Sequence, residues 1–321
     1  MILVGFDIGG TKCAVSLGEA KDGDVRILDK RALPTPERWQ DALGRLFALA
    51  EELLAGRQSA ACGFSCGSPL DAEAGLVLSP PNLPGWDRVP VTEMARERFG
   101  APAFLENDAN ACALAEWRWG AGKGSRSMAF LTFGTGMGAG LILDGRLYRG
   151  ANGSAGEVGH TRLAPFGPAG YGKEGSFEGF CSGGGVAQLG VTLGKRAVQS
   201  GAAPAYYTGS WDDVTTKSIA QAAQAGDGTA RAVFELCGEK LGEGLSVLVD
   251  IINPECIVIG SIFARCEALL RPAMERVMAR ECLPSSLSAV RVVPAALGEQ
   301  IGDYAALCVA EYGLAQAKHT A

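Results

Sequence analysis

The stretch ILVGFDIGGTKCAVSL, residues 2–17, decides the fold. Apolar runs on both sides of a glycine pair predict a strand, a turn at Gly9 and Gly10, and a returning strand. The stretch MAFLTFGTGMGAGLILDGRLYRG, residues 128–150, repeats this order of strand, glycine-rich tip and strand. Two such hairpins more than a hundred residues apart favour duplicated α/β lobes over a solenoid. We expect each lobe to offer one glycine-rich tip to a shared cleft.

The length and composition fit a two-lobed enzyme. The 321 residues exceed the usual size of one domain, and the 45 glycines indicate many tight turns. The net charge is −6 and the basic residues are scattered, so we expect no nucleic-acid partner. The chain has no apolar run of about 20 residues and no basic leader, so we expect a cytoplasmic protein with no membrane partner. The ten cysteines lie mostly in apolar patterns, which favours buried free thiols over disulfides.

Both glycine-rich tips carry groups suited to phosphate binding. In DIGGTK, residues 7–12, the glycines free backbone N–H groups, Thr11 can donate a hydrogen bond, and Asp7 can hold Mg²⁺ directly or through water. An ordinary hairpin turn is the alternative. GTGMGAG, residues 134–140, also fits a relaxed dinucleotide fingerprint, but that fingerprint needs a helix next, and LILDGRLY predicts a strand. We therefore interpret it as a second phosphate-binding hairpin.

A strand-to-helix junction in ENDANACALAE, residues 106–116, places Asn107 and Asp108 where they can face the cleft. Asp108 can act as a general base that accepts a proton from a substrate hydroxyl, with Asn107 orienting that hydroxyl. Both residue types are also good helix N-caps, so a purely structural role stays open.

The glycine-rich segment 151–185 has little periodicity, and loops of that length are usually functional or disordered. Within it, Glu157 and His160 lie three residues apart and would share one face of a helical turn. A carboxylate and an imidazole can grip sugar hydroxyls, which need both acceptors and donors. A metal site would need further ligands at close spacing, and Cys181 is the one thiol nearby. A surface loop with a satisfied histidine stays an alternative.

Six segments in order resemble the ROK family of sugar kinases, which belongs to the superfamily of actin and hexokinase. They are DIGGTK at 7–12, PNLPGW at 81–86, ENDANACALAE at 106–116, FGTGMGAGLI at 133–142, NGSAGEVGH at 152–160 and INPECIVIG at 252–260. The resemblance covers nearly the whole chain. It implies an α/β, two-domain actin-like ATPase fold of the duplicated ribonuclease H-like type, with a cleft between the lobes. The implied small domain comprises residues 1–116 plus 300–321, and the large domain residues 117–299.

The resemblance also implies ATP and a sugar in the cleft, with Asp108 as the general base. The residues it places at the sugar are Gly67, Ser68, Asn82, Asn107, Glu157, His160 and Glu178. Those it places around the phosphates are Gly9, Gly10, Thr11, Lys12, Gly134, Thr135 and Gly136, with Gly260 near the adenosine.

The loop after His160 departs from the family. Members typically carry C-x-C-G-x-x-G-C-x-E there, and its three cysteines join the histidine on a structural zinc. Here the segment is AGYGKEGSFE, with Ala169, Tyr171 and Ser176 at the cysteine positions. Alanine and serine supply no thiolate and a lone imidazole binds zinc poorly, so zinc is not expected. We expect Tyr171 to pack where the metal would lie.

The implied reaction is transfer of the γ-phosphoryl group of Mg-ATP to a hexose hydroxyl, with C6 of glucose as the first choice. Ser261 and Ile262 stand where the family often has a further glycine pair near the adenine, which leaves the nucleotide preference open. The alternative function is a catalytically silent sugar-binding or regulatory ROK protein. ROK regulators carry a helix-turn-helix segment ahead of the core, and this chain starts at the first strand, so we expect a kinase. A homodimer is consistent with the family.

Overall fold

The computed structural model describes residues 1–320 and contains two five-stranded sheets with one common strand order. The first sheet runs β3-β2-β1-β4-β7 and the second β10-β9-β8-β13-β14. In each, the first three strands along the chain are antiparallel neighbours, and the last two run parallel to the first. The strands are β1 (Ile2–Ile8), β2 (Lys12–Lys21), β3 (Asp24–Pro34), β4 (Ala61–Cys66), β7 (Ala103–Asn107), β8 (Met128–Leu131), β9 (Ala139–Leu143), β10 (Arg146–Tyr148), β13 (Cys256–Ile259) and β14 (Arg291–Pro294).

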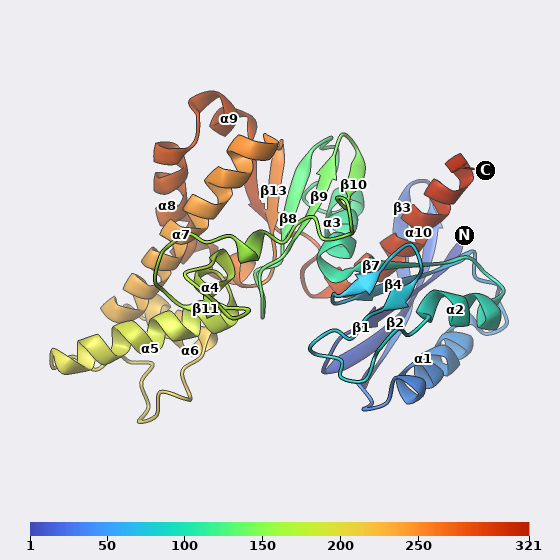
Figure 1. The fold of residues 1–321 in the computed structure, drawn as a ribbon, viewed down its shortest axis with the longest axis horizontal. Helices are drawn as coiled ribbons and strands as arrows, with labels where there is room; N and C mark the ends of the chain where they lie inside the picture. The colour runs from blue at the N-terminus through green and yellow to red at the C-terminus, as the bar shows by residue number, and fades with distance from the viewer. Residues whose placement is uncertain (321) are drawn as a thin grey trace.

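Two short hairpins and a set of helices complete the lobes (Figure 1). The hairpin strands are β5 (Leu70–Asp71), β6 (Leu76–Val77), β11 (Ala169–Gly170) and β12 (Lys173–Glu174). The helices are α1 (Trp39–Leu54), α2 (Val91–Phe99), α3 (Asp108–Trp119), α4 (Phe177–Phe180), α5 (Gly183–Gln199), α6 (Thr216–Gln224), α7 (Gly228–Ile252), α8 (Ile262–Glu281), α9 (Pro284–Ala289) and α10 (Ile301–Thr320). Turns of 3-10 helix cover Val158–His160 and Gly298–Gln300. The duplicated lobes predicted from the two hairpins are therefore confirmed.

The helix after the last strand of each lobe packs on the sheet of the other lobe. Helix α3 follows β7 but contacts β8 and β9, whereas α10 follows β14 but contacts β1 and β4, and the two helices also contact each other. Glycines allow these close approaches. A Cβ atom on Gly63 would lie 2.2 Å from the Ala306 carbonyl oxygen, and one on Gly140 would lie 2.6 Å from the Ala109 carbonyl oxygen. Any larger side chain at either position would force the helix away from the sheet.

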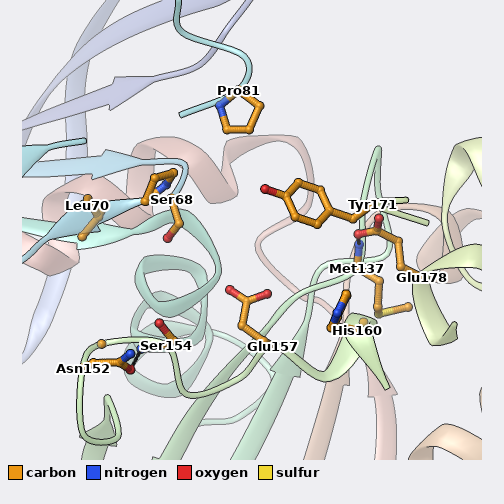
Figure 2. A pocket seen from close by; sticks show the side chains of 13 residues that line it. Ser68, Leu70, Pro81, Met137, Asn152, Ser154, Glu157, His160, Tyr171 and Glu178 are labelled. Atoms are coloured by element: carbon orange, nitrogen blue, oxygen red, sulfur yellow. Dashed lines mark hydrogen bonds between the residues drawn. The ribbon is translucent and has the colours of Figure 1, made fainter. Parts of the chain in front are cut away.

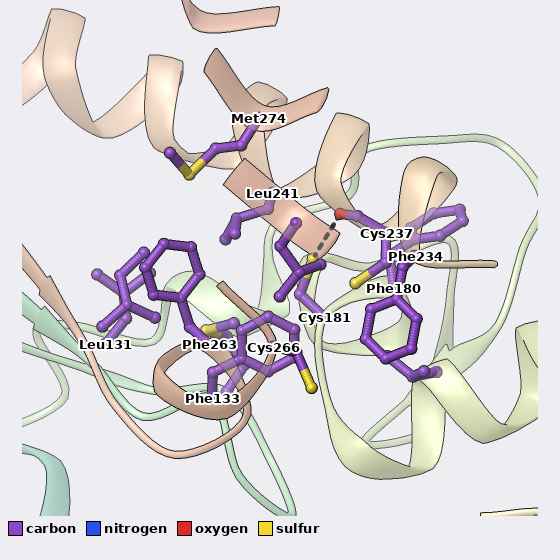
Figure 3. Close-up of a cluster of buried hydrophobic side chains, with 14 of the residues drawn as sticks. Leu131, Phe133, Phe180, Cys181, Phe234, Cys237, Leu241, Phe263, Cys266 and Met274 are labelled. Carbon is purple, nitrogen blue, oxygen red and sulfur yellow. Dashed lines mark hydrogen bonds between the residues drawn. The ribbon is translucent and has the colours of Figure 1, made fainter. Parts of the chain in front are cut away.

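Buried apolar side chains fill each lobe, and the cysteines belong to these cores. Figure 3 shows the cluster of the second lobe, where Phe133, Phe234 and Phe263 surround Cys237 and Cys266. All ten cysteines are free and nine of them are buried, which confirms the prediction of buried thiols. Desolvation raises the pKa of Cys62 to about 12, so this thiol stays protonated at neutral pH. Within residues 1–320, no helix is long and apolar enough to cross a membrane.

Candidate active site

The first glycine-rich tip joins β1 to β2 and is braced from within its own lobe. The Gly9 carbonyl oxygen accepts a 2.6 Å hydrogen bond from the Thr35 hydroxyl. Gly10 lies against the proline-rich loop, where a Cβ atom would come within 2.5 Å of the Asn82 carbonyl oxygen. The loop predicted to face the sugar therefore touches the tip predicted to face the phosphates.

The second tip joins β8 to β9 and is held by a side chain from a distant segment. Glu178 Oε2 accepts a 2.9 Å hydrogen bond from the Met137 N–H, 41 positions earlier in the chain. A Cβ atom on Gly136 would lie 2.8 Å from the same carboxylate oxygen. The Gly183 N–H at the start of α5 donates a 2.8 Å hydrogen bond to the Gly134 carbonyl oxygen. The shape of this tip therefore depends on Glu178.

Both tips open into one cavity of about 660 Å³ between the lobes. A second cavity of about 580 Å³ adjoins it, and Glu157 and Glu178 line both (Figure 2). The predicted residues that line the first cavity are Gly10, Thr11, Ser68, Asn82, Asn107, Asp108, Gly134, Thr135, Gly136, Glu157 and Glu178. His160 lines the second. Residues far apart in the sequence are thus brought together as the two-lobe prediction requires.

Asn107 and Asp108 divide the two roles that the sequence left open. Asn107 is the N-cap of α3, since its Oδ1 accepts hydrogen bonds from the N–H groups of Ala109 at 2.9 Å and Asn110 at 3.3 Å. Its Nδ2 donates a 2.8 Å hydrogen bond to Ser68 Oγ. Asp108 opens into the cavity, but the surrounding protein removes much of its water, and this desolvation raises its pKa. A raised pKa suits a carboxylate to general-base chemistry near neutral pH.

Asp7 is the penultimate residue of β1, behind the first tip, and carries a perturbed carboxylate. Desolvation raises its pKa from 3.8 to about 6, and the negative charges of Asp303 and Asp108 add to the rise. In the part of the chain that the structure describes, no hydrogen bond or ion pair reaches this carboxylate. Asp303, in contrast, contacts Lys30 Nζ at 2.5 Å and Ser16 Oγ at 2.8 Å. A desolvated carboxylate without a partner, next to the tip predicted to bind phosphate, fits a divalent cation.

The segment NGSAGEVGH runs beside the second tip and places four polar side chains in the cavity wall: Asn152, Ser154, Glu157 and His160. A Cβ atom on Gly159 would lie 2.0 Å from the Met137 carbonyl oxygen, so only glycine fits there. Val158–His160 forms a 3-10 turn that follows Glu157. Figure 2 shows Glu157 and His160 on the same side of the cavity as Glu178. The shared face predicted from their spacing is therefore present.

An ion pair between the lobes escaped the sequence analysis. Glu106 is 2% exposed, and its Oε2 accepts a 2.7 Å hydrogen bond from Arg149 Nε. Its Oε1 accepts hydrogen bonds from the Asn107 N–H at 3.1 Å and from Asn110 Nδ2 at 2.9 Å. Arg149 follows β10 and precedes the NGSAGEVGH segment, so this carboxylate ties the Asp108 junction to the opposite cavity wall. An acidic residue inside the apolar strand AFLEN was the available signal, because Glu is rarely buried without a partner.

The loop after His160 closes without cysteines. Ser176 Oγ accepts a 3.0 Å hydrogen bond from the Gly179 N–H and so caps α4. Ala169 exchanges two hydrogen bonds with the Gln188 side chain, at 3.0 and 2.9 Å. Among the described residues, no group of three or more His, Cys, Asp or Glu side chains could hold a metal ion. Whether the protein carries zinc stays a prediction for metal analysis.

The expected packing of Tyr171 inside this loop is wrong. The side chain is 78% exposed. Tyr171 and Gly172 form the two-residue turn between β11 and β12, with φ angles of 46° and 72°. A residue at the tip of so tight a turn points away from the hairpin, and Figure 2 shows the ring over the cavity.

Some predicted residues line neither cavity, and some lining residues were not predicted. The former are Asp7, Gly9, Lys12, Gly67 and Gly260. The latter include Pro69, Leu70, Pro81, Met137, Asn152, Ser154 and Tyr171. Gly67 lies behind Asn82, since its Cβ would be 3.7 Å from Asn82 Oδ1. Ser261, with a φ of 54°, lies beside the second tip, where a Cβ on Gly134 would be 3.6 Å from Ser261 Oγ.

Comparison with known proteins identifies the family. The sequence model of the ROK family matches residues 3–311. The chain belongs to the ROK family. The glucokinase of Thermotoga maritima is 31% identical over 308 residues, with 94% of each chain covered. The ROK hexokinase from Thermus thermophilus has a TM-score of 0.79 at 31% identity, covering 98% of this chain and 100% of that one. The ROK glucokinase from Streptomyces griseus, solved in complex with glucose and AMPPNP, has a TM-score of 0.78 at 29% identity with the same coverage.

The ROK structures confirm the predicted fold class. Both solved relatives are ROK kinases with the actin-like ATPase fold, and they match almost the whole of this chain. The two sheets of common strand order are the duplicated halves of that fold. The six motifs of the sequence therefore identified the family correctly.

Proposed function

We propose that the protein transfers the γ-phosphoryl group of Mg-ATP to a hydroxyl of a hexose, with the C6 hydroxyl of glucose as the first choice. Membership of the ROK family, with a glucokinase and ROK kinase structures as relatives, makes the chain a carbohydrate kinase. The observation that carries the finer proposal is the place of Asp108. Its carboxylate lies in one cavity with both glycine-rich tips and with Asn107 and Glu178. Phosphoryl transfer to a hydroxyl needs a base, a phosphate cradle and groups that hold the acceptor.

The proposal gives each wall of the cavity a role. Asp108 accepts the proton of the acceptor hydroxyl as its oxygen attacks the γ-phosphorus in line, and the bond from that phosphorus to ADP breaks. Asn107 orients the hydroxyl, since its side chain is fixed by the α3 cap and by Ser68. Glu157, His160 and Glu178 bind other hydroxyls from the second lobe. The N–H groups of both tips face the phosphates.

Asp7 is the residue proposed to hold Mg²⁺, directly or through water. The support is its desolvated carboxylate with a pKa of about 6 and no hydrogen-bond partner in the described chain. When bound, Mg²⁺ offsets the negative charge of the phosphates. Lys12, which lowers the pKa of Asp7 through its positive charge, lies on the same tip.

A coupled ADP-release assay with Mg-ATP tests the proposal against a panel of hexoses and N-acetylhexosamines, with and without a zinc chelator. We expect turnover that favours one hexose and is unchanged by the chelator. Folded protein that releases no ADP with any sugar would contradict the kinase proposal. Loss of turnover in chelator, restored by zinc, would contradict the zinc-free site.

Two further proposals concern organisation. The boundaries at 1–116 plus 300–321 and at 117–299 are proposed for the two domains, and limited proteolysis should cut near them. A homodimer is proposed from the family, and light scattering after size exclusion measures the mass directly.

A further inference from the structure

We infer that Tyr171 determines acceptor specificity, because its ring forms a wall on which the carbon face of a pyranose stacks. The inference rests on the proposed function and names a feature of the acceptor that the hydroxyl-binding residues do not select.

The ring of Tyr171 lies in the cavity of about 580 Å³, here named the acceptor cavity because Glu157, His160 and Glu178 line it. Figure 2 shows it reaching over the cavity, with Pro81 and Ser68 of the first lobe opposite and the Glu157 and Glu178 carboxylates on its own side. The side chain is 78% exposed, so packing within the protein does not account for it. An aromatic face is therefore available beside the groups proposed to bind sugar hydroxyls.

The backbone at Tyr171 is costly. Two-residue hairpin turns with positive φ at both central positions favour Asn-Gly or Gly-Gly, and here the pair is Tyr-Gly with φ angles of 46° and 72°. A left-handed conformation costs a residue other than glycine about 1–2 kcal/mol. The exposed ring makes no buried contact that would offset this cost. A strained residue at the rim of a cavity is an indication of function.

The hairpin that carries Tyr171 is fixed to the site. Lys173 Nζ donates a 2.6 Å hydrogen bond to the carbonyl oxygen of His160, itself a cavity residue. Arg162 donates a 2.6 Å hydrogen bond to the Glu174 carbonyl oxygen. Ala169 is bonded twice to Gln188 of α5. Because these hydrogen bonds fix the hairpin, the backbone that carries the ring loses little conformational freedom when a ligand binds.

The surfaces of the cavity match the two surfaces of a pyranose. Glu157, Glu178 and His160 supply partners for hydroxyls, whereas the Tyr171 ring supplies a flat apolar surface with a negative face. A pyranose chair presents a rim of hydroxyls and a face of C–H groups that carry partial positive charge. An open-chain polyol also carries hydroxyls at C2, C3, C4 and C6 but has no fixed carbon face. Tyr171 should therefore favour the ring form.

The test uses Tyr171→Asn, Tyr171→Phe and the matched control Phe166→Ala. Phe166 is an equally exposed aromatic on the same loop, at 81%, but lines neither cavity. The acceptors are glucose, 1,5-anhydroglucitol, which keeps the ring, and sorbitol, which lacks it. We expect Tyr171→Asn to raise the KM for glucose on the order of tenfold, the effect of one aromatic contact, with kcat and the KM for ATP within about twofold. Its Tm should stay the same or rise, because Asn suits the turn. Tyr171→Phe and Phe166→Ala should match the wild type.

The preference for 1,5-anhydroglucitol over sorbitol should shrink in Tyr171→Asn by the same factor. An unchanged KM in this variant, or an equal rise in Phe166→Ala, would overturn the inference. If the wild type phosphorylates no sugar, the proposed function fails, and Tyr171 is then judged by calorimetric binding of glucose. Binding about tenfold weaker in Tyr171→Asn would support the aromatic wall, and equal or absent binding in both proteins would overturn it.

Discussion

The two lobes share one strand order, but they hold their glycine-rich tips by different means. The first tip is pressed by the Asn82 carbonyl, which lies against Gly10, and its Gly9 carbonyl oxygen accepts a hydrogen bond from the Thr35 hydroxyl. The second tip is held by a carboxylate, since Glu178 bonds the Met137 N–H and lines the acceptor cavity as well. The first tip is therefore sensitive to the size of its residues, whereas the second connects the proposed phosphate site to the proposed acceptor site.

Asp108 lines the same cavity as both tips, and its substitution should lower activity more than a substitution in either tip. We expect Asp108→Asn to lower kcat by about 10²–10⁴, because the acceptor hydroxyl loses its base, with the sugar KM within about threefold. Initial rates with the preferred sugar measure this. Asp212→Asn, an exposed carboxylate far along the second lobe, is the control and should match the wild type. A kcat that survives in Asp108→Asn would remove Asp108 from the chemistry.

An added methyl group should damage the first tip and spare the end of the second. Gly10→Ala places a Cβ 2.5 Å from the Asn82 carbonyl oxygen, whereas Gly138→Ala finds its nearest neighbour, Ala109 Cβ, at 3.6 Å. We expect kcat/KM to fall on the order of a hundredfold in Gly10→Ala, as for a misplaced reacting group, and by less than about threefold in Gly138→Ala. Equal losses in both variants would break the contrast between the tips.

The coupling at the second tip should appear in two KM values at once. Glu178→Gln weakens the brace on Met137 and one contact to the acceptor, so we expect the KM for ATP and the KM for the sugar each to rise about tenfold. Glu157→Gln is the matched control, because Glu157 lines both cavities and its carboxylate has no hydrogen bond to the tip among the described residues, so only the sugar KM should rise. A sugar effect alone in Glu178→Gln would show that the brace does not matter for nucleotide binding.

The buried negative charge of Asp7, behind the first tip, should make the wild type less stable than Asp7→Asn at neutral and higher pH. Asp7 has a pKa of about 6 in the folded protein and 3.8 as an unperturbed group, so the folded state binds its proton more tightly. The contribution of Asp7 to the stability of the wild type is therefore present below about pH 4 and is lost as pH rises from about 4 to about 6. Without nucleotide or metal, Asp7→Asn should raise the free energy of unfolding at pH 8 by about 1–3 kcal/mol, and Tm with it by a few degrees. At pH 4.5 both increases should be much smaller.

Thermal melts of wild type and Asp7→Asn at the two pH values measure this difference. Asp303→Asn should do the opposite and lower Tm, because Asp303 is 4% exposed and bonded to Lys30 and Ser16. A Tm for Asp7→Asn below that of the wild type at pH 8 would mean that the carboxylate has a stabilising partner.

The strand–turn–strand form of the tips and the place of Asp108 at a strand-to-helix junction could be predicted, because each depends on a short run of contiguous residues. A glycine turn between strands and a polar junction between strand and helix need no distant partner. The sequence signalled that Glu106 needs a partner, but it could not predict that the partner is Arg149, nor that Glu178 bonds the second tip, since folding decides which distant groups meet. Tyr171 was misjudged because aromatic residues usually bury, whereas the positive φ values of a two-residue turn directed this ring outward.

Each lobe packs a helix on the sheet of the other, and this determines when each sheet can be covered during synthesis on the ribosome. The second sheet receives its partner helix early, because α3 is synthesised before β8 begins. The first sheet stays without its covering helix for longer. Its strands are complete at Asn107, whereas α10, whose Ala306 lies against Gly63, begins only at Ile301. At translation rates of about 5–20 residues per second, this delay is on the order of ten seconds or longer. For that time the sheet of the nascent first lobe lacks the helix that covers one of its faces, and this uncovered apolar face is a site where a chaperone would bind during synthesis.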